Sequence, residues 1–236
     1  MLGKLYGIGI GPGDPELITL KGFRLLQNCP VVAYPAPDEG KSLARQIVAS
    51  YLSGHQEEFA IRMPMVEQRF PAQEIYDWAA EQLGQRLKDG RDVAVLCEGD
   101  PFFYGSFMYL FGRMADKFAV EVVPGVSSLM ACATSLSAPL AARNDILSVL
   151  PGTLDEATLI ERITGADAVA IIKVGRHLHK IRKIVDKLGL NPHARYIEHA
   201  TMSNQVIMPL SDIDKTHRAP YFSMILIHTR GAAWHV

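Results

Sequence analysis

GIGIGPGDP, residues 7–15, continues an apolar run from Leu5 to Ile10 that predicts a strand. The four glycines in this stretch are more than a tight turn needs, so we expect a close approach of the backbone or positive φ angles. A helix is predicted from Leu17 to Gln27, and its first amides could bind an anion. The stretch therefore predicts a ligand-binding loop at a strand end, where α/β proteins place their sites.

Neither common phosphate-binding motif fits this loop. A dinucleotide-binding GxGxxG needs a third glycine where the sequence has Pro12, Asp14 or Glu16. Gly40-Lys-Ser42 resembles the end of a phosphate-binding loop, but that motif requires a glycine where Pro35 stands. HExxH, GxSxG and a Cys/His quartet are also absent from the sequence. The sequence therefore predicts neither a metal site nor a serine hydrolase triad.

Two further loops follow predicted strands. Glu98-Gly-Asp-Pro101 comes directly after the apolar run Val93 to Cys97, and Pro124-Gly-Val-Ser-Ser128 follows Val120 to Val123. The acidic loop could hold hydroxyl groups or a cation, or form an ordinary turn. The serines could cap a helix or face a ligand. Aromatic residues that follow the acidic loop are expected mostly in the core: Phe102, Phe103, Tyr104, Phe107 and Tyr109.

Apolar and amphipathic segments alternate along the chain, which predicts an α/β fold with a mainly parallel N-terminal sheet. Helices are expected at 17–27, 42–52, 73–88, 127–136, 155–163 and 178–188. A polar, proline-containing stretch near residue 140 predicts a junction between domains at 1–140 and 141–236. Strands at 206–208 and 222–227 are expected to close a mixed C-terminal sheet. A cleft between the two domains is the expected ligand site.

Composition argues against polyanionic partners. Lys and Arg total 24 and Asp and Glu total 25, so the formal net charge is -1. We therefore expect no nucleic-acid or membrane partner, and interpret the basic stretch Arg176–Lys183 as the solvated face of a helix. Cys29, Cys97 and Cys132 form no recognisable disulfide or metal pattern. No signal-peptide pattern and no apolar run of about 18 residues occurs, which predicts a soluble, cytoplasmic protein.

Together and in this order, the three loops resemble the tetrapyrrole methylase family. The matching segments are Gly9-Ile-Gly-Pro-Gly-Asp-Pro15, Leu17-Ile-Thr-Leu-Lys-Gly22, Glu98-Gly-Asp-Pro101, Val123-Pro-Gly-Val-Ser-Ser128, Ile172-Lys-Val-Gly175 and Glu198-His-Ala-Thr201. The resemblance covers nearly the whole chain. It implies two α/β domains, S-adenosylmethionine in the cleft between them, a tetrapyrrole substrate and a homodimer.

The resemblance also implies site residues. Cofactor contacts would fall on Pro12, Glu98, Gly99, Asp100, Phe103, Ser127, Ser128, Val174 and Ala200, with Ser223 and Met224 added from the last strand. The loop Gly9–Asp14 would border the substrate trough, where its amides could meet the carboxylates of the macrocycle.

Within the family, two segments resemble the branch that methylates precorrin-2 at C20 to give precorrin-3A in cobalamin biosynthesis: Ala33-Tyr-Pro-Ala36 and Gly99–Leu110. The branch that makes precorrin-2 has an Asp, proposed there as a proton acceptor, where this chain has Pro35. The catalytic base is therefore unknown, with Glu98 and Tyr104 as candidates. Two alternatives stay open: the same methylation of the cobalt-containing analogue, cobalt-factor II, and a non-catalytic tetrapyrrole carrier.

Overall fold

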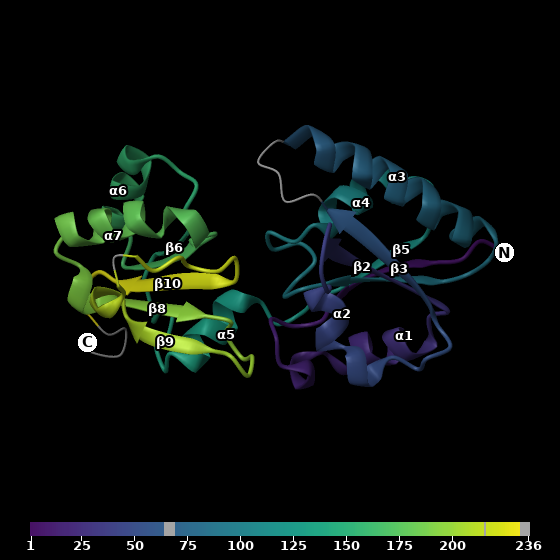
Figure 1. The fold of residues 1–236 in the computed structure, drawn as a ribbon, viewed down its shortest axis with the longest axis horizontal. Helices are drawn as coiled ribbons and strands as arrows, with labels where there is room; N and C mark the ends of the chain where they lie inside the picture. The colour runs from purple at the N-terminus through teal and green to yellow at the C-terminus, as the bar shows by residue number, and fades with distance from the viewer. Residues whose placement is uncertain (64–68, 215, 232–236) are drawn as a thin grey trace. The chain divides into compact units, whose positions relative to one another are not determined.

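The computed structural model describes residues 1–63, 69–214 and 216–231, and the chain divides into two compact units, Met1–Ser127 and Ser128–Val236 (Figure 1). In the described residues, each unit contains one five-stranded sheet. The division falls earlier than the junction expected near residue 140. Helix α5 (Ser128–Ser135) precedes that junction, but its buried Leu129 and Cys132 pack in a core with residues of the second sheet.

The sheet of the first unit is parallel, as predicted. Its strand order is β3-β2-β4-β1-β5, and every pairing between neighbours is parallel. The strands are β1 (Leu5–Gly9), β2 (Val31–Pro37), β3 (Glu57–Met63), β4 (Val93–Cys97) and β5 (Val120–Val123). Because the strands run the same way, the loops that follow them lie at one edge of the sheet.

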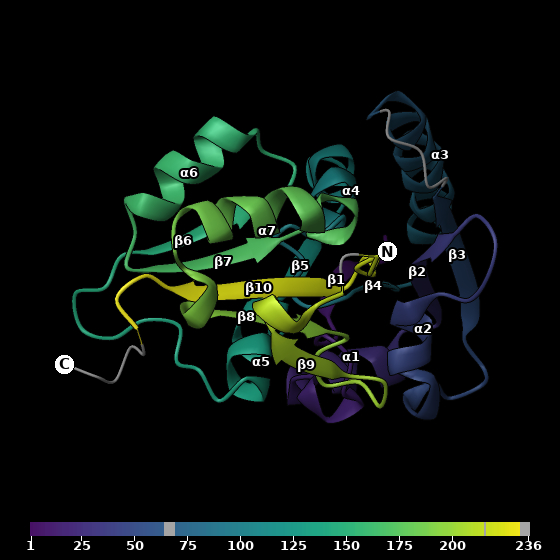
Figure 2. The same ribbon diagram turned by 60° about the vertical axis from the view of Figure 1, so that its left-hand side comes forward.

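Helices cover both faces of this sheet (Figures 1 and 2). On one face, α1 (Leu20–Asn28) and α2 (Leu43–Ile47) pack against alternate residues of β4, including Leu96. On the other, α3 (Arg69–Lys88) and α4 (Phe107–Met114) pack against Val95 and its neighbours. Short 3₁₀ turns at Pro15–Leu17 and Ala49–Tyr51 complete this unit. The helices expected at 17–27 and 42–52 are therefore each divided into a 3₁₀ turn and a helix.

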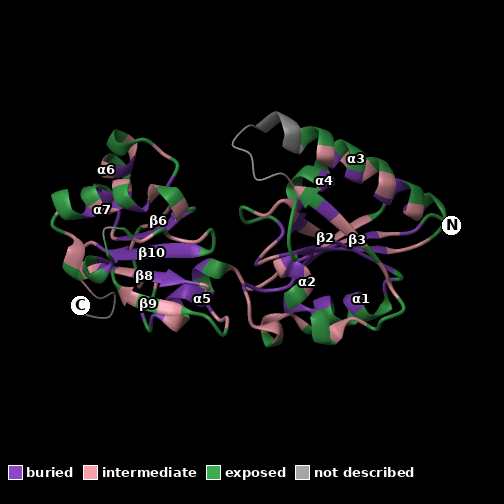
Figure 3. Ribbon diagram, in the orientation of Figure 1, coloured by how far each residue is buried: buried purple, intermediate pink, exposed green. Residues whose placement is uncertain are grey.

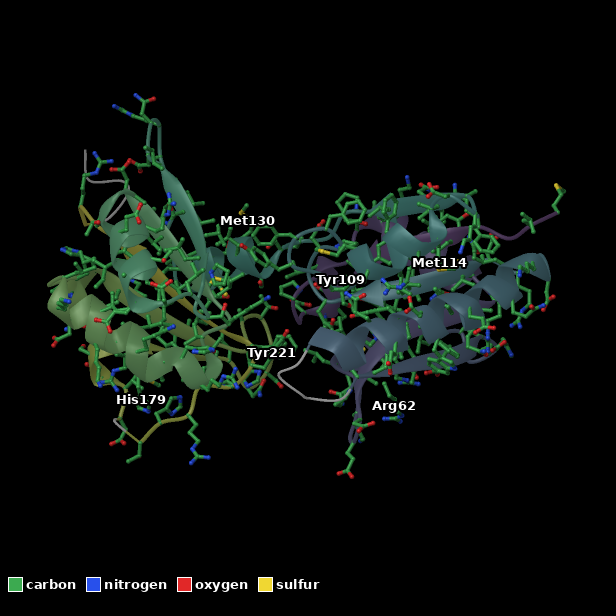
Figure 4. All side chains as sticks on the ribbon, turned by 90° about the horizontal axis from the view of Figure 1, so that it is seen from above. Arg62, Tyr109, Met114, Met130, His179 and Tyr221 are labelled. Carbon is green, nitrogen blue, oxygen red and sulfur yellow. The ribbon has the colours of Figure 1, made fainter. Side chains whose placement is uncertain are left out.

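Helix α4 was not expected, because its aromatic residues were assigned to the core as a group. Only one of the five lies there: Phe107 is 1% exposed, whereas Phe102, Phe103, Tyr104 and Tyr109 are 36% to 50% exposed. Phe107 recurs with Leu110 and Met114 at helical spacing, so the helix buries one face and leaves the other open. Tyr109, which is labelled in Figure 4, lies on the open face. Its ring packs beside that of Tyr76, with the ring centroids 5.0 Å apart.

The sheet of the second unit is mixed, as predicted, with strand order β6-β7-β10-β8-β9. Its strands are β6 (Leu147–Pro151), β7 (Ala168–Ile172), β8 (Ala194–Glu198), β9 (Val206–Pro209) and β10 (Ser223–His228). Among the described strands of this second sheet, β6 and β7 pair in parallel and the other neighbours pair antiparallel. The chain also forms 3₁₀ turns at Gly175–His177, Asn191–His193 and Leu210–Asp212.

Two helices, α6 (Glu156–Thr164) and α7 (Leu178–Lys187), share one core with this sheet, and α5 shares another (Figures 2 and 3). On α7, Leu178 and Ile181 are buried while His179 and Lys183 are exposed, which fits the interpretation of this basic stretch as a helix surface. No helix in the described part of the chain is long and apolar enough to cross a membrane.

Candidate functional site

The three glycine loops meet at the carboxyl edge of the first sheet, because β1 lies between β4 and β5. The amide of Ile10 donates to the carbonyl of Cys97 at 3.0 Å, and the amide of Gly99 donates to the carbonyl of Gly11 at 2.8 Å. Gly11 and Gly99 have φ angles of 81° and 68°, in the left-handed region that favours glycine. The expectation of positive φ in the first loop is therefore confirmed.

Glycine is also required here by the contact of one loop with another. A Cβ on Gly9 would lie 2.5 Å from the nitrogen of Gly125, and a Cβ on Gly125 would lie 2.1 Å from the carbonyl oxygen of Gly99. Neither distance leaves room for a side chain. The close backbone approach predicted for the first loop is thus found between the loops themselves. These contacts fix the geometry of the loops without a ligand.

Asp100 holds two of these loops together. Its Oδ2 accepts a hydrogen bond from the amide of Gly125 at 3.0 Å, and its Oδ1 accepts one from the amide of Phe102 at 2.9 Å. After this turn, Tyr104 has a φ angle of 55°, which is unusual for a residue other than glycine. Phe103 and Tyr104 are 36% and 47% exposed, so the turn presents two aromatic rings to solvent. Strained backbone of this kind is often found at functional sites.

Glu98 follows β4 directly and is half-buried. Burial raises the pKa of its carboxyl, and the backbone amides of Glu98 itself and of Ala44 act against that rise. A carboxylate with a raised pKa is a stronger proton acceptor than an exposed one. Glu98 therefore combines a half-buried carboxyl and a raised pKa with a position at the carboxyl edge of the first sheet.

Three further predicted residues belong to the first and third loops: Pro12, Ser127 and Ser128. Pro12 is buried between Gly11 and the 3₁₀ turn that Asp14 caps by accepting a hydrogen bond from the amide of Glu16 at 2.9 Å. Ser127 is half-buried and Ser128, the first residue of α5, is exposed.

Pro35 lies in an apolar environment. It lines a small pocket together with Ile61, Val95 and Phe107, and its carbonyl accepts a hydrogen bond from the hydroxyl of Ser42 at 2.5 Å. A carboxylate at position 35 would be desolvated by these neighbours. The structure thus surrounds this position with groups that suit proline rather than a charged base.

In the second unit, four predicted residues come together at one sheet edge. Because β10 runs antiparallel to β7 and β8, its first residues lie beside the ends of those strands: Ser223 pairs with Glu198. The four residues are at most 8% exposed: Val174, Ala200, Ser223 and Met224. Such buried residues offer a ligand mainly their backbone. The turns beside them contain left-handed φ angles at Lys173 (54°), His199 (48°) and Thr201 (68°).

A buried polar cluster at this edge was missed by sequence reasoning. Glu198 is 7% exposed, and its Oε1 accepts a hydrogen bond from the hydroxyl of Tyr196 at 2.6 Å. The same oxygen lies 2.6 Å from Nε2 of His217. Burial raises the pKa of Tyr196 strongly, and the hydrogen bond to Glu198 adds to this rise. The signal that could have revealed the pair is the Tyr-x-Glu spacing, which places both side chains on one face of a strand.

Two α/β units and three glycine loops at the edge of a parallel sheet are features that the resemblance to the tetrapyrrole methylases implied. The comparison with known families points to the same family. Residues 4–214 match the model of the Tetrapyrrole (Corrin/Porphyrin) Methylases. The chain belongs to this family.

Individual relatives show which members of the family this chain is similar to. The chain is 38% identical over 234 residues to a precorrin-2 C(20)-methyltransferase from Sinorhizobium sp, covering 96% of this chain and 95% of that one. It is 39% identical over 233 residues to the cobalamin biosynthesis protein CobIJ of Mycobacterium bovis, covering 95% of this chain and 46% of that protein. The chain thus spans less than half the length of this mycobacterial relative.

Solved structures share the fold. The uroporphyrin-III C-methyltransferase from Thermus thermophilus, complexed with S-adenosyl homocysteine, superposes with a TM-score of 0.67. It is 24% identical in sequence and covers 97% of this chain and 99% of its own.

Proposed function

We propose that this chain transfers a methyl group from S-adenosylmethionine to C20 of precorrin-2, giving precorrin-3A in cobalamin biosynthesis. The observation that supports this most is the 38% identity, over nearly the full length of both chains, to the Sinorhizobium precorrin-2 C(20)-methyltransferase. Pro35 supports the same choice within the family. It lines an apolar pocket and stands where the uroporphyrinogen branch is expected to have an aspartate.

We propose that the cofactor contacts these residues: Pro12, Glu98, Gly99, Asp100, Phe103, Ser127, Ser128, Val174, Ala200, Ser223 and Met224. The chemistry of these groups fits S-adenosylmethionine. Phe103 offers an exposed aromatic ring, and Glu98 offers a carboxylate. The carboxylate of Asp100 accepts two amide hydrogen bonds, so it also holds the loop in shape besides its proposed contact with the cofactor.

When bound, S-adenosylmethionine supplies an already activated methyl group, so the protein need not generate an electrophile. The main task of the residues is then to align the methyl donor with an electron-rich carbon of the macrocycle and to exclude water. The rigid contact of Gly9, Gly99 and Gly125 suits alignment, because these loops cannot separate without breaking their hydrogen bonds. The amides of the Gly9–Asp14 loop are proposed to meet carboxylates of the substrate.

Methylation of the bridge carbon must be followed by loss of a proton. Glu98 is the proposed acceptor, because burial raises the pKa of its carboxyl and makes it a better base at neutral pH. From the family resemblance we also propose that the protein is a homodimer in the cytoplasm. The mass of the protein in solution, measured by light scattering, tests whether it is a dimer.

The assay that tests the function follows transfer of radiolabel from S-adenosylmethionine to precorrin-2 and, in parallel, to its cobalt-containing analogue. A methyltransferase specific for precorrin-2 gives a higher kcat/KM with the metal-free substrate. The reverse preference favours the cobalt alternative. Binding of tetrapyrrole without any transfer of label contradicts the proposal and favours a carrier.

A further inference from the structure

The buried carboxylate of Glu198 has no role in the proposed chemistry. It is the last residue of β8 and lies on the same face as Tyr196, two residues earlier. A carboxylate is costly to bury unless hydrogen bonds and opposite charge compensate for the lost water. Here the hydroxyl of Tyr196 and Nε2 of His217 each lie 2.6 Å from its Oε1, so both groups stabilise the carboxylate.

His217 reaches Glu198 from the segment that leads to β10. The start of this segment is held by the core residue Ile213, and the turn after it is closed by the amide of His217 donating to the carbonyl of Asp214 at 3.2 Å. The end of the segment is held where the hydroxyl of Ser223 donates to the carbonyl of Pro220 at 2.7 Å. The contact between His217 and Glu198 therefore holds the middle of this segment. Ser223, the last residue of the segment, is a proposed cofactor contact.

Glu198 also borders the turn that contains another proposed contact, Ala200. The residues on either side of Ala200, His199 and Thr201, both have left-handed φ angles. Non-glycine residues keep such angles only where the surrounding structure imposes them. The amide of His199 donates to the carbonyl of Phe222 at 2.9 Å, and the amide of Thr201 donates to Oε1 of Gln205 at 2.7 Å. Glu198 is the anchored residue from which this strained turn starts.

We propose that Glu198, through its hydrogen bonds with Tyr196 and His217, is a positioning residue that holds the Ala200 turn and Ser223 in the conformation that binds the cofactor. Glu198 itself does not touch the reacting atoms. The inference rests on the proposed function, because it uses Ala200 and Ser223 as cofactor contacts. Apolar side chains of similar volume would often give the same or greater stability than a buried carboxylate and its partners. The proposal therefore gives Glu198 a functional reason for being there.

The test compares Glu198→Gln and His217→Gln with the wild type, using calorimetric titration with S-adenosylhomocysteine. Both variants keep a side chain of similar shape and weaken the charged hydrogen bond. We expect the Kd for S-adenosylhomocysteine to rise about tenfold in each, which corresponds to about 1.4 kcal/mol. In turnover, the KM for S-adenosylmethionine should rise in parallel, while kcat and the KM for the tetrapyrrole stay within about twofold of wild type.

Asp155→Ala is the matched control in the same unit. Asp155 caps α6 by accepting a hydrogen bond from the amide of Thr158 at 2.9 Å, so its loss should lower the melting temperature without changing the Kd. The proposal is overturned if the Glu198 and His217 variants bind like wild type, or if Asp155→Ala weakens binding equally. If Glu198→Gln fails to fold, His217→Gln decides alone, since His217 is 30% exposed. If the wild type itself does not bind S-adenosylhomocysteine, the proposed function fails as well.

Discussion

Replacing Gly125 by alanine should disrupt the convergence of the three loops. The added Cβ would lie 2.1 Å from the carbonyl oxygen of Gly99 and 2.7 Å from the Cα of Gly9, so one loop must move by about 1.3 Å to reach ordinary van der Waals contact. Overpacking of this kind costs about 1–3 kcal/mol. Movement of Gly125 also strains its 3.0 Å hydrogen bond to the carboxylate of Asp100, which contributes about 1.5–3 kcal/mol.

Together these effects predict a loss of about 2.5–6 kcal/mol in the free energy of unfolding, measured by urea denaturation, and weaker binding of S-adenosylhomocysteine. Gly112→Ala is the matched control, because Gly112 lies within α4 and an added Cβ there meets no atom within 4 Å. Alanine should stabilise that exposed helical position by up to about 1 kcal/mol. The reasoning is refuted if Gly125→Ala is as stable as wild type and binds S-adenosylhomocysteine equally well.

Three further predictions follow from particular side chains. Hydrogen bonds from Lys21 and Lys4 lower the pKa of Glu121 from 4.5 to about 2, so these ion pairs stabilise the folded state above pH 4.5 and the contribution is lost as the pH falls towards 2. Glu121→Gln should therefore flatten the acid limb of a stability–pH curve, and an unchanged limb would contradict this. Pro35→Asp should lower the free energy of unfolding by about 1–3 kcal/mol in denaturant titrations without creating activity on uroporphyrinogen; a stable, active variant would refute the argument. Burial raises the pKa of the Cys29 thiol to about 12, so native protein should react with iodoacetamide at pH 8 far more slowly than unfolded protein.

The buried strands were the most predictable part of the fold. The continuous apolar run Val93–Cys97 became β4 with the same bounds, because a strand covered on both faces has no polar positions to blur its ends. The aromatic segment after it was misassigned. Its residues share hydrophobicity, and only the spacing of Phe107, Leu110 and Met114 distinguishes the buried face of α4 from the exposed one.

The candidate site was predictable where it depends on loops that follow parallel strands. The position of Gly9, Gly99 and Gly125 at one edge follows from the strand order, but their contact with each other depends on backbone packing that no sequence spacing encodes. The cluster of Glu198 with His217 was beyond reach for a similar reason. Its partners are 19 residues apart, and only the return of the chain into β10 brings them together.

The central claim is methyl transfer to C20 of precorrin-2, and one measurement tests it most directly. The protein is incubated with precorrin-2 and S-adenosylmethionine carrying a ¹³C-labelled methyl group, and the product is examined by NMR. We predict a single new labelled methyl group attached to C20, formed only in the presence of protein. Label at another carbon of the macrocycle, or unlabelled precorrin-2 recovered with active cofactor and folded protein, would contradict the account.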